Sequence, residues 1–458
     1  MTQIASVILA AGKGTRMKSH MPKVLHNVCG KPMLEYVIMA AQEAGGGRNV
    51  VVIGHEAEMV RESIGSTVEW AYQAEQLGTG HAVMQAENLL ADFDGSILIL
   101  CGDTPLITAA TLTRLISSHR ESGRAATVLT AIMEDPGGYG RIVRDPKTDS
   151  VLEIVEHKDA SSEQLEIKEI NTGMYCFEGK RLFAVLTKIT PANAQGEYYL
   201  TDVLAVLRTE GEQVGAVTVD DPQECMGIND RIQLAEAEKA LRLRVMHRLM
   251  MDGVTILDPG TTYIDFEVTV GPDSVIYPGT ILEGRCRLGE NCLIGPYTRL
   301  KDTETGNNVT VHSSIILESS VGNNVTVGPF AYIRPGTVLS DETKVGDFVE
   351  IKKSVIGRGS KVPHLSYVGD AVIGEKVNIG AGTITCNYDG TRKYGTVIGS
   401  NAFIGSNTNL VAPIEVGESA VVGAGSTLTK DVPDGALCVE RSKQVTYPGW
   451  AARKNKKK

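Results

Sequence analysis

The stretch IGSNAFIGSNTNLVAPIEVGESAVVGAGSTL, from Ile398 to Leu428, decides the fold of the C-terminal half of the chain. Aliphatic residues recur in it at every sixth position, namely at Ile398, Ile404, Leu410, Val416, Val422 and Leu428. This period fits neither the period of about 3.6 residues of a helix nor the alternation of a simple strand. It is typical of a coil with a triangular cross-section, in which each of three short sides turns one aliphatic side chain inward.

Two further series extend this pattern toward the N-terminus. They are Val270, Ile276, Leu282, Leu288, Ile294 and Leu300, and then Val321, Val327, Ile333, Leu339, Val345 and Ile351. Three such sides make a coil of about 18 residues, and stacking at about 4.8 Å predicts about nine coils over residues 265–430. The sequence leaves the hand of the coil open, although the general rule for parallel crossovers favours a right-handed one.

The period slips twice between residues 351 and 398. The first irregular segment, 361–367, contains His364, and the second, 385–395, is a polar and aromatic loop. Loops that project from the corners of a coil are where such proteins carry function. A lone histidine is more often structural than catalytic, so His364 by itself leaves the question open. The neighbouring coils supply the cations Arg334, Lys352 and Arg358.

Residues 1–228 have a different organisation, with short apolar runs alternating with helix-like stretches. The runs are Ile4–Ala10, Val50–Ile53 and Ile97–Leu100, and the helix-like stretches are Met33–Ala44, Thr79–Ala91 and Ala109–Glu121. The alternation predicts a Rossmann-like α/β domain, with a mostly parallel sheet covered by helices on both faces. Residues 229–252 predict a long linker helix, which leaves 253–458 for the coil.

The composition excludes several classes of protein. Hydrophobic residues at 42% and charged residues at 22% argue against disorder, and a net charge of −10 argues against broad binding to nucleic acid or membrane surfaces. We find no apolar run of the roughly 18 residues that span a membrane, and no signal-peptide pattern. The eight cysteines are scattered, which favours free thiols in the cytoplasm. The basic segment 453–458 is expected to be a solvated tail.

A glycine-rich loop follows the first apolar run. It reads Leu9-Ala10-Ala11-Gly12-Lys13-Gly14-Thr15-Arg16-Met17, and Pro22-Lys23 comes next. Glycines let the backbone approach an anion, and Lys13, Arg16 and Lys23 add positive charge. The loop is neither a dinucleotide fingerprint, because Met17 replaces the third glycine, nor a Walker A loop. Taken alone, it is also compatible with a plain glycine-rich turn.

Two more polar segments adjoin predicted strands or helices. Asp103 follows the run Ile97–Leu100 after Cys101-Gly102. A carboxylate at the end of a strand can hold Mg²⁺ against phosphate oxygens, although an Asp in a turn can instead accept from its own backbone. The segment 73–80, Gln-Ala-Glu-Gln-Leu-Gly-Thr-Gly, opens a predicted helix. It could contact a base or a phosphate, or simply cap that helix.

These motifs resemble the signature of sugar-1-phosphate nucleotidyltransferases. With segments 138–142 (GYGRI), 155–158 (VEHK), 171–173 (NTG) and the repeat, the whole chain is similar to one bacterial family, the bifunctional N-acetylglucosamine-1-phosphate uridyltransferases / glucosamine-1-phosphate acetyltransferases. The resemblance implies a left-handed parallel β-helix, a cytoplasmic homotrimer, Mg²⁺, and the co-substrates UTP and acetyl-CoA. It also implies that acetyl transfer precedes uridylyl transfer and that the product serves cell-envelope polymers. The family usually has Tyr where this chain has Cys101, which leaves one nucleotide contact in question.

The resemblance also implies site residues for uridylyl transfer. The nucleotide would contact Leu9, Ala10, Ala11, Gly12, Arg16, Lys23, Gln73, Gly78 and Thr79. The sugar phosphate would contact Gly140, Glu156, Asn171 and Asn229, and Mg²⁺ would be held by Asp103 and Asn229.

For acetyl transfer, the resemblance implies a second set. An amine attacks a thioester only when unprotonated, so a base such as His364 is needed, with Glu350 expected to orient it. Glucosamine-1-phosphate would contact Arg334, Lys352, Tyr367 and Asn378. Acetyl-CoA would contact Ala381, Asn387, Tyr388, Ser406, Ala424 and Arg441.

Two other functions compete with this interpretation. One is a nucleotidyltransferase for another sugar, whose coil serves only regulation or assembly; His364 and the loop 385–395 argue against it. The other is a non-catalytic scaffold, against which Lys23, Asp103 and His364 argue together.

Overall fold

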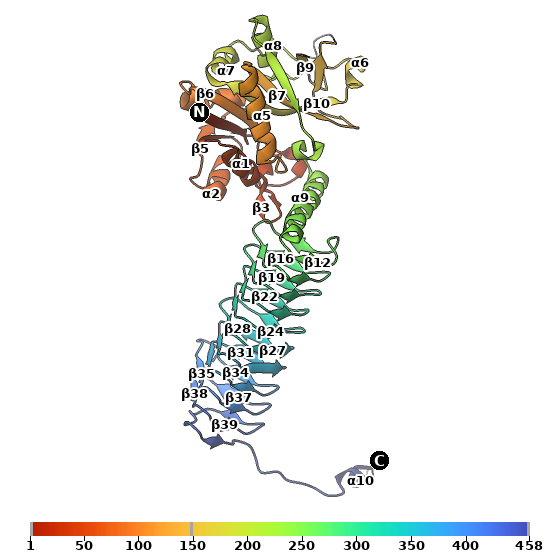
Figure 1. Cartoon of the computed structure of the whole chain (residues 1–458). Coiled ribbons are helices and arrows are strands. Elements are labelled where there is room, and N and C mark those ends of the chain that lie inside the picture. Colours follow the sequence, from red (N-terminus) through yellow and green to blue (C-terminus); the bar gives the residue numbers. More distant parts are fainter. Residues whose placement is uncertain (1–2, 147–149, 456–458) are drawn as a thin grey trace. The chain divides into compact units, whose positions relative to one another are not determined.

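The computed structural model describes residues 3–146 and 150–455, which form two compact units, Met1–Leu241 and Arg242–Lys458 (Figure 1). The helix α9, Arg231–Met251, contributes its first half to one unit and its second half to the other. The last three lysines of the basic segment lie outside the described residues. None of the described helices combines the length and the apolarity needed to cross a membrane.

In the first unit the described residues form a nine-stranded, mostly parallel sheet. Its main path runs in the order β11-β7-β10-β6-β1-β4-β5. The central strand β1 (Gln3–Leu9) pairs in parallel with β4 (Arg48–Ile53) and β6 (Gly95–Cys101). These strands are the three predicted apolar runs, and their Val, Ile and Leu side chains are buried on both faces. The predicted Rossmann-like sheet is confirmed.

Other strands complete this sheet. They are β5 (Glu69–Tyr72), β7 (Ala126–Ile132), β8 (Arg141–Arg144), β9 (Val151–Val155), β10 (Glu169–Glu178) and β11 (Val214–Thr218). Strand β10 is antiparallel to both β6 and β7, and β8 and β9 form a hairpin-like pair beside it. The sequence did not predict this antiparallel insertion.

Helices cover the two faces of the sheet over separate apolar clusters. One cluster includes α1 (Met33–Glu43) and α5 (Ala109–Ser122), and the other includes α3 (Thr79–Met84), α7 (Gly179–Leu186) and α8 (Asp202–Thr209). The predicted helix Thr79–Ala91 is wrong as one element, because α3 ends at Met84 and α4 begins at Glu87. The side-chain amide of Gln85 donates to the His81 carbonyl at 3.0 Å, and the Gln85 backbone N–H donates to the Ala82 carbonyl. The regular helical hydrogen bond from Gln85 to His81 is therefore missing.

The second unit is a left-handed parallel β-helix, as the resemblance implied. Its strands form three faces, and every third strand returns to the same face (Figure 1). The first face runs from β12 (Thr255–Ile256) to β41 (Leu437–Cys438), the second from β13 (Tyr263–Ile264) to β40 (Thr427–Leu428), and the third from β14 (Thr269–Val270) to β38 (Ile414–Val416). After β41 the chain leaves the β-helix, and the last described element is α10 (Trp450–Asn455).

The aliphatic series behaves as predicted. Every residue of the three series is buried in one continuous core, into which α9 also places Val245, Met246 and Leu249. The predicted constant length of a coil is wrong between residues 300 and 321. There Leu300 pairs with Ile316 and Glu304 with Ser320, only 16 residues on. Some corners here are formed by a single residue with a left-handed backbone, such as Asp302 and Ser313 with φ near 45°. Each such corner makes the side of the coil one residue shorter.

Candidate active sites

A cavity of about 310 Å³ lies at the carboxyl ends of β1, β5 and β6, where ligands of parallel sheets bind. Eight of the nine residues expected around the nucleotide line it, namely Leu9, Ala10, Ala11, Gly12, Lys23, Gln73, Gly78 and Thr79. The ninth, Arg16, is exposed in the short helix Thr15–Met17 and is not part of the lining. Gln76, from the predicted segment 73–80, also lines the cavity, and sequence reasoning missed three further lining residues, Val24, Ala82 and Glu197.

Two glycines allow close packing at this cavity, Gly78 in its lining and Gly14 against the lining residue Lys23. Gly14 has φ 58°, and a Cβ there would lie 2.5 Å from Lys23 Cβ. Gly78 has φ 109°, and its Cβ would lie 2.6 Å from the carbonyl oxygen of Tyr198. A side chain at either position would therefore displace the backbone. In contrast, a Cβ on Gly12 would meet open space, so the backbone of that residue faces room for a ligand.

The Lys23 ammonium joins two distant parts of the chain beside the cavity. It pairs with the Asp103 carboxylate and donates to Asn229 Oδ1 at 3.0 Å. The backbone N–H of Ile228 donates to the Asp103 carbonyl at 2.9 Å, which holds the segment before α9 in place. Asp103 and Asn229, the two expected metal ligands, thus present oxygen atoms to one cation.

These oxygen donors fit Mg²⁺. Mg²⁺ keeps several waters and takes one or two protein ligands together with substrate phosphates. Among the described residues, no three His, Cys, Asp or Glu side chains gather at one point to form a complete protein cage. A site with one carboxylate and one amide therefore matches a cation whose remaining ligands come from the nucleotide and from water.

Three of the four expected sugar-phosphate residues gather around β10. Asn171 donates its backbone N–H to the Gly140 carbonyl at 2.9 Å, and its side-chain oxygen accepts from the Tyr175 hydroxyl at 3.0 Å. A Cβ on Gly140 would lie 3.5 Å from Glu156 Oε2. The structure therefore brings Gly140, Glu156 and Asn171 together, while Asn229 lies with Lys23 and Asp103.

Burial shapes the charges of this site. Desolvation raises the pKa of Glu156, and the Thr201 hydroxyl, 3.5 Å from Glu156 Oε1, opposes the shift by donating to the carboxylate. Burial also raises the pKa of the Cys101 thiol to about 12. This thiol lines the nucleotide cavity and lies 3.5 Å from the Gly173 carbonyl. Cys101 therefore contacts the cavity as a neutral, weakly polar group.

In the β-helix, His364 stands at the end of β30 (Lys361–His364) on the first face. Its Nδ1 lies 2.6 Å from Oδ1 of Asp347, the last residue of β27 (Lys344–Asp347), and the two Cα atoms are paired across the ladder. The expectation that Glu350 orients His364 is wrong, because the Glu350 carboxylate accepts a hydrogen bond from Arg334 at 2.8 Å instead. Glu350 belongs to β28 (Glu350–Lys352) on the second face, around the corner from His364.

Three of the residues expected at acetyl-CoA continue the same edge of the first face. Ala381, Ser406 and Ala424 each lie two residues after an inward-facing residue that is paired in the ladder. These inward-facing residues are Ile379, Ile404 and Val422. His364 and Asp347 follow Val362 and Val345 by the same offset. Asn378 lies on this face in β33 (Asn378–Ile379), and Arg441 donates to the Ala424 carbonyl at 2.8 Å. One edge therefore carries His364 and a row of expected cofactor contacts.

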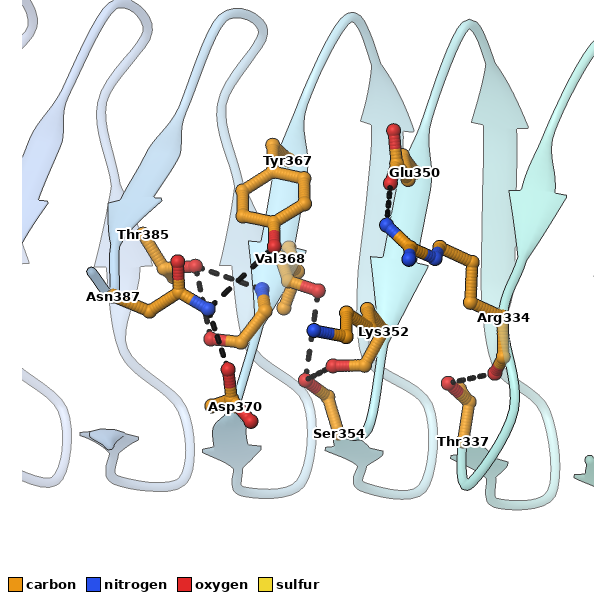
Figure 2. Close-up of polar contacts among 11 residues, drawn as sticks. Arg334, Thr337, Glu350, Lys352, Ser354, Tyr367, Val368, Asp370, Thr385 and Asn387 are labelled. Carbon is orange, nitrogen blue, oxygen red and sulfur yellow. Dashed lines mark hydrogen bonds and ion pairs between the residues drawn. The ribbon is translucent and has the colours of Figure 1, made fainter. Parts of the chain in front are cut away.

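The second face presents the expected phosphate-binding groups on successive coils (Figure 2). Arg334, Lys352 and Tyr367 come from neighbouring coils, and Tyr367 is paired with Glu350 in the ladder. Asn387 donates to Asp370 at 2.5 Å and lies 3.5 Å from the Tyr367 hydroxyl (Figure 2). This contact ties the loop 385–395 to the β-helix.

The loop also brings a cation that sequence reasoning missed. The ammonium group of Lys352 lowers the pKa of this residue, Lys393. Two adjacent cations beside Arg334 favour a bound phosphate. A signal was available, because Lys393 lies in the polar loop that interrupts the repeat. Tyr388, in the same loop, is exposed and donates to the Gly390 carbonyl at 2.6 Å.

Comparison with known proteins agrees with both halves of this description. The family Nucleotidyl transferase matches residues 5–222, and Bacterial transferase hexapeptide (six repeats) matches 267–302 and 395–430. Relatives called "Bifunctional protein GlmU" match over the full length. The protein of Heliobacterium modesticaldum is 56% identical, covering 100% of this chain and 99% of that protein. Those of Caldanaerobacter subterraneus subsp. tengcongensis and Pelotomaculum thermopropionicum are 55% and 59% identical, each covering at least 99% of both chains.

Proposed function

This chain belongs to the family of bifunctional GlmU proteins, and on that premise we propose which of its residues carry out each of two reactions. It is a bifunctional transferase. One reaction transfers the acetyl group of acetyl-CoA to glucosamine-1-phosphate, and the other transfers the uridylyl group of UTP to N-acetylglucosamine-1-phosphate, giving UDP-N-acetylglucosamine and pyrophosphate. The observation that carries our assignment is that the Lys23–Asp103–Asn229 cluster and the His364 edge belong to different compact units.

For uridylyl transfer, a phosphate oxygen of the sugar attacks the α-phosphorus of UTP, and the bond to the pyrophosphate oxygen breaks. Both partners are anions, so catalysis consists of aligning them and neutralising charge. Asp103 and Asn229 would hold Mg²⁺, which supplies positive charge to the phosphate oxygens when bound. Lys23 adds a second cation, and the backbone of Leu9–Gly12 offers N–H groups to the nucleotide.

The residues around β10 would bind the sugar of the second substrate in that reaction. Asn171 and the Gly140 backbone would position the hydroxyl and acetamido groups of the sugar. Glu156 is half-buried beside Gly140 and would accept from a sugar hydroxyl. Because its pKa is raised by burial, a hydrogen bond donated by the substrate would favour the charged carboxylate.

For acetyl transfer, His364 Nε2 would accept the proton of the sugar amine as its nitrogen attacks the thioester carbon. The carbon–nitrogen bond forms, the carbon–sulfur bond breaks, and the imidazolium returns the proton to the leaving thiolate of coenzyme A. Arg334, Lys352 and Lys393 would hold the phosphate of glucosamine-1-phosphate, and the edge with Ala381, Ser406 and Ala424 would hold the cofactor.

We also propose that the β-helix assembles as a homotrimer and that the protein works in the cytoplasm. Two observations support assembly: His364 is exposed in a single chain, and a row of apolar corner residues, including Phe330 and Phe348 with rings 5.5 Å apart, is exposed beside it. The eight cysteines are free thiols, which suits the reducing compartment where UTP and acetyl-CoA are made.

Paired variants test this division of labour. Asp103→Ala should abolish uridylyl transfer and leave acetyl transfer intact. His364→Ala should lower kcat of acetyl transfer by about 10²-fold or more and leave uridylyl transfer intact. Equal loss of both activities in either variant would contradict the assignment.

A further inference from the structure

The contact between Asp347 and His364 is built into the backbone of two adjacent coils. Strands β27 and β30 each have four residues, whereas β24 (Thr326–Val327) and β33 on the same face have two. The longer ladder ends with Asp347 opposite His364, and Nδ1 and Oδ1 are 2.6 Å apart. The two side chains therefore leave the β-helix side by side.

Gly346 allows this close ladder. A Cβ at residue 346 would lie 1.8 Å from the Pro363 carbonyl oxygen, a distance that no side chain tolerates. Beyond the pair, the backbone N–H of Leu365 donates to the Asp347 carbonyl at 3.0 Å, and the Ser366 hydroxyl donates to the His364 carbonyl at 2.8 Å. The backbone on both sides of the pair is thus fixed.

The chemistry of the contact determines which imidazole nitrogen carries the proton. A carboxylate only accepts hydrogen bonds, so Nδ1 must donate, and in the neutral ring Nε2 then has the free lone pair. The hydrogen bond from His364 lowers the pKa of Asp347, which keeps this partner ionised. The acceptor is therefore a full negative charge at neutral pH.

Several other charged groups lie on the strands that meet at this corner. Glu350 accepts from Arg334 at 2.8 Å. The remaining charged or titratable groups on the elements that meet here are Lys344 on β27, Lys361 on β30, Lys352 on β28 and Tyr367 on β31 (Tyr367–Gly369). Asp347 is thus the carboxylate in contact with the imidazole.

From this geometry we propose that Asp347 is a positioning residue for acetyl transfer. It holds His364 in the tautomer protonated at Nδ1, aims the ring, and stabilises the imidazolium that forms when Nε2 takes the proton of the amine. The inference rests on the proposed role of His364 as the base. Both side chains are substantially exposed in the single chain, so the pair adds little to folding stability, and its effect is expected in the reaction.

Asp347→Asn in the full-length protein tests the proposal, with Glu342→Gln as the matched control. Glu342 pairs with Arg358 on the same β-helix, at 2.5 Å, away from His364. We expect Asp347→Asn to lower kcat of acetyl transfer about 10- to 100-fold, with KM for acetyl-CoA within about twofold. Loss of the neighbouring carboxylate should also move the acid limb of the kcat/KM profile to lower pH. Glu342→Gln should change neither, and circular dichroism with thermal unfolding reports that the β-helix of each variant is folded.

Nitrogen-15 NMR of histidine-labelled protein gives a readout independent of turnover. The signals of His364 are identified by their absence in His364→Gln. In the unaltered protein the neutral ring should carry its proton on Nδ1, and Asp347→Asn should shift the population toward Nε2–H. A ring already protonated at Nε2 in the unaltered protein, or a kcat and acid limb unchanged in Asp347→Asn, would overturn the proposal.

The same set separates this proposal from the assignment of the base. If His364→Gln keeps normal acetyl transfer, the base is misassigned and the proposal falls with it. If His364→Gln loses activity while Asp347→Asn keeps it, only the positioning role is refuted.

Discussion

The Lys23 ammonium lies 3.0 Å from Asn229 Oδ1, across 206 residues of sequence, and it also pairs with Asp103. The lysine thus occupies the point toward which the two expected metal ligands face. When Mg²⁺ and a nucleotide bind, phosphate oxygens and Mg²⁺ would provide new partners for these three side chains. This cluster determines the first prediction.

Asn229→Ala should raise the Mg²⁺ concentration required for half-maximal uridylyl transfer by about 10-fold or more, because one oxygen donor is removed. The measurement is a Mg²⁺ titration of uridylyl transfer at saturating UTP. The exposed Asn88→Ala is the control. An unchanged titration curve would remove Asn229 from the metal site, and acetyl transfer should be normal in both variants.

Gly78→Ala should raise KM for UTP and destabilise the first unit by about 1–3 kcal/mol, because its Cβ would lie 2.6 Å from the Tyr198 carbonyl oxygen and its φ is 109°. Gly47→Ala is the matched control, since its Cβ would meet only the Ile4 carbonyl oxygen, at 3.8 Å. Steady-state kinetics and thermal unfolding check both variants. Equal behaviour of the two alanines would show that the loop tolerates a side chain.

Lys352→Ala should raise KM for glucosamine-1-phosphate about 10- to 100-fold, the effect of losing one charge-assisted contact with a phosphate. Lys344→Ala, an exposed lysine on the first face, should leave KM unchanged. Initial rates of acetyl transfer at varied sugar phosphate distinguish them. A KM unaffected by Lys352→Ala would place the phosphate elsewhere.

Glu156→Gln should stabilise the protein at neutral pH. Because burial raises the pKa of Glu156, the native state binds this proton more tightly than the unfolded state does. The stabilisation that this tighter proton binding gives the native state is therefore complete below the pKa of Glu156 in the unfolded state, about 4.3. It is lost as pH rises through the pKa of Glu156 in the folded state. We expect Tm of Glu156→Gln to exceed that of the unaltered protein at pH 7.5, and the difference to vanish near pH 4. A difference independent of pH would exclude this cause.

The position of the domain boundary is tested by two C-terminal fragments. Val245, Met246 and Leu249 of α9 are buried in the core of the β-helix, and burying each such side chain is worth about 1.5–3 kcal/mol. We propose that the functional acetyltransferase unit includes this part of α9. Fragment 229–458 should therefore unfold at a higher temperature than fragment 253–458, as measured by circular dichroism. Equal Tm values would place the boundary after the helix.

Local pattern alone was enough for the stacked coils, whereas the residues around the nucleotide cavity were assigned through the resemblance to sugar-1-phosphate nucleotidyltransferases. An inward aliphatic side chain at every sixth position is a short-range rule, and all the predicted positions are buried. What pattern did provide is the location, because Leu9–Gly12 and Asp103 lie at the ends of predicted apolar strands, and the carboxyl ends of parallel strands share one edge. The inward aliphatic positions and the location of these strand ends required no knowledge of contacts between distant residues.

Pairing across coils was decided only by the tertiary structure. With coils of constant length, about 18 residues, Gly346 would have stood opposite His364, but the shorter coil places Asp347 there, 17 residues away. The length of each coil depends on how many residues its corners use, and a left-handed corner residue can be Asn, Asp, Phe or Leu in this chain. The sequence by itself therefore determined that a histidine lies at the edge of the β-helix, and the folded corners decided which carboxylate reaches it.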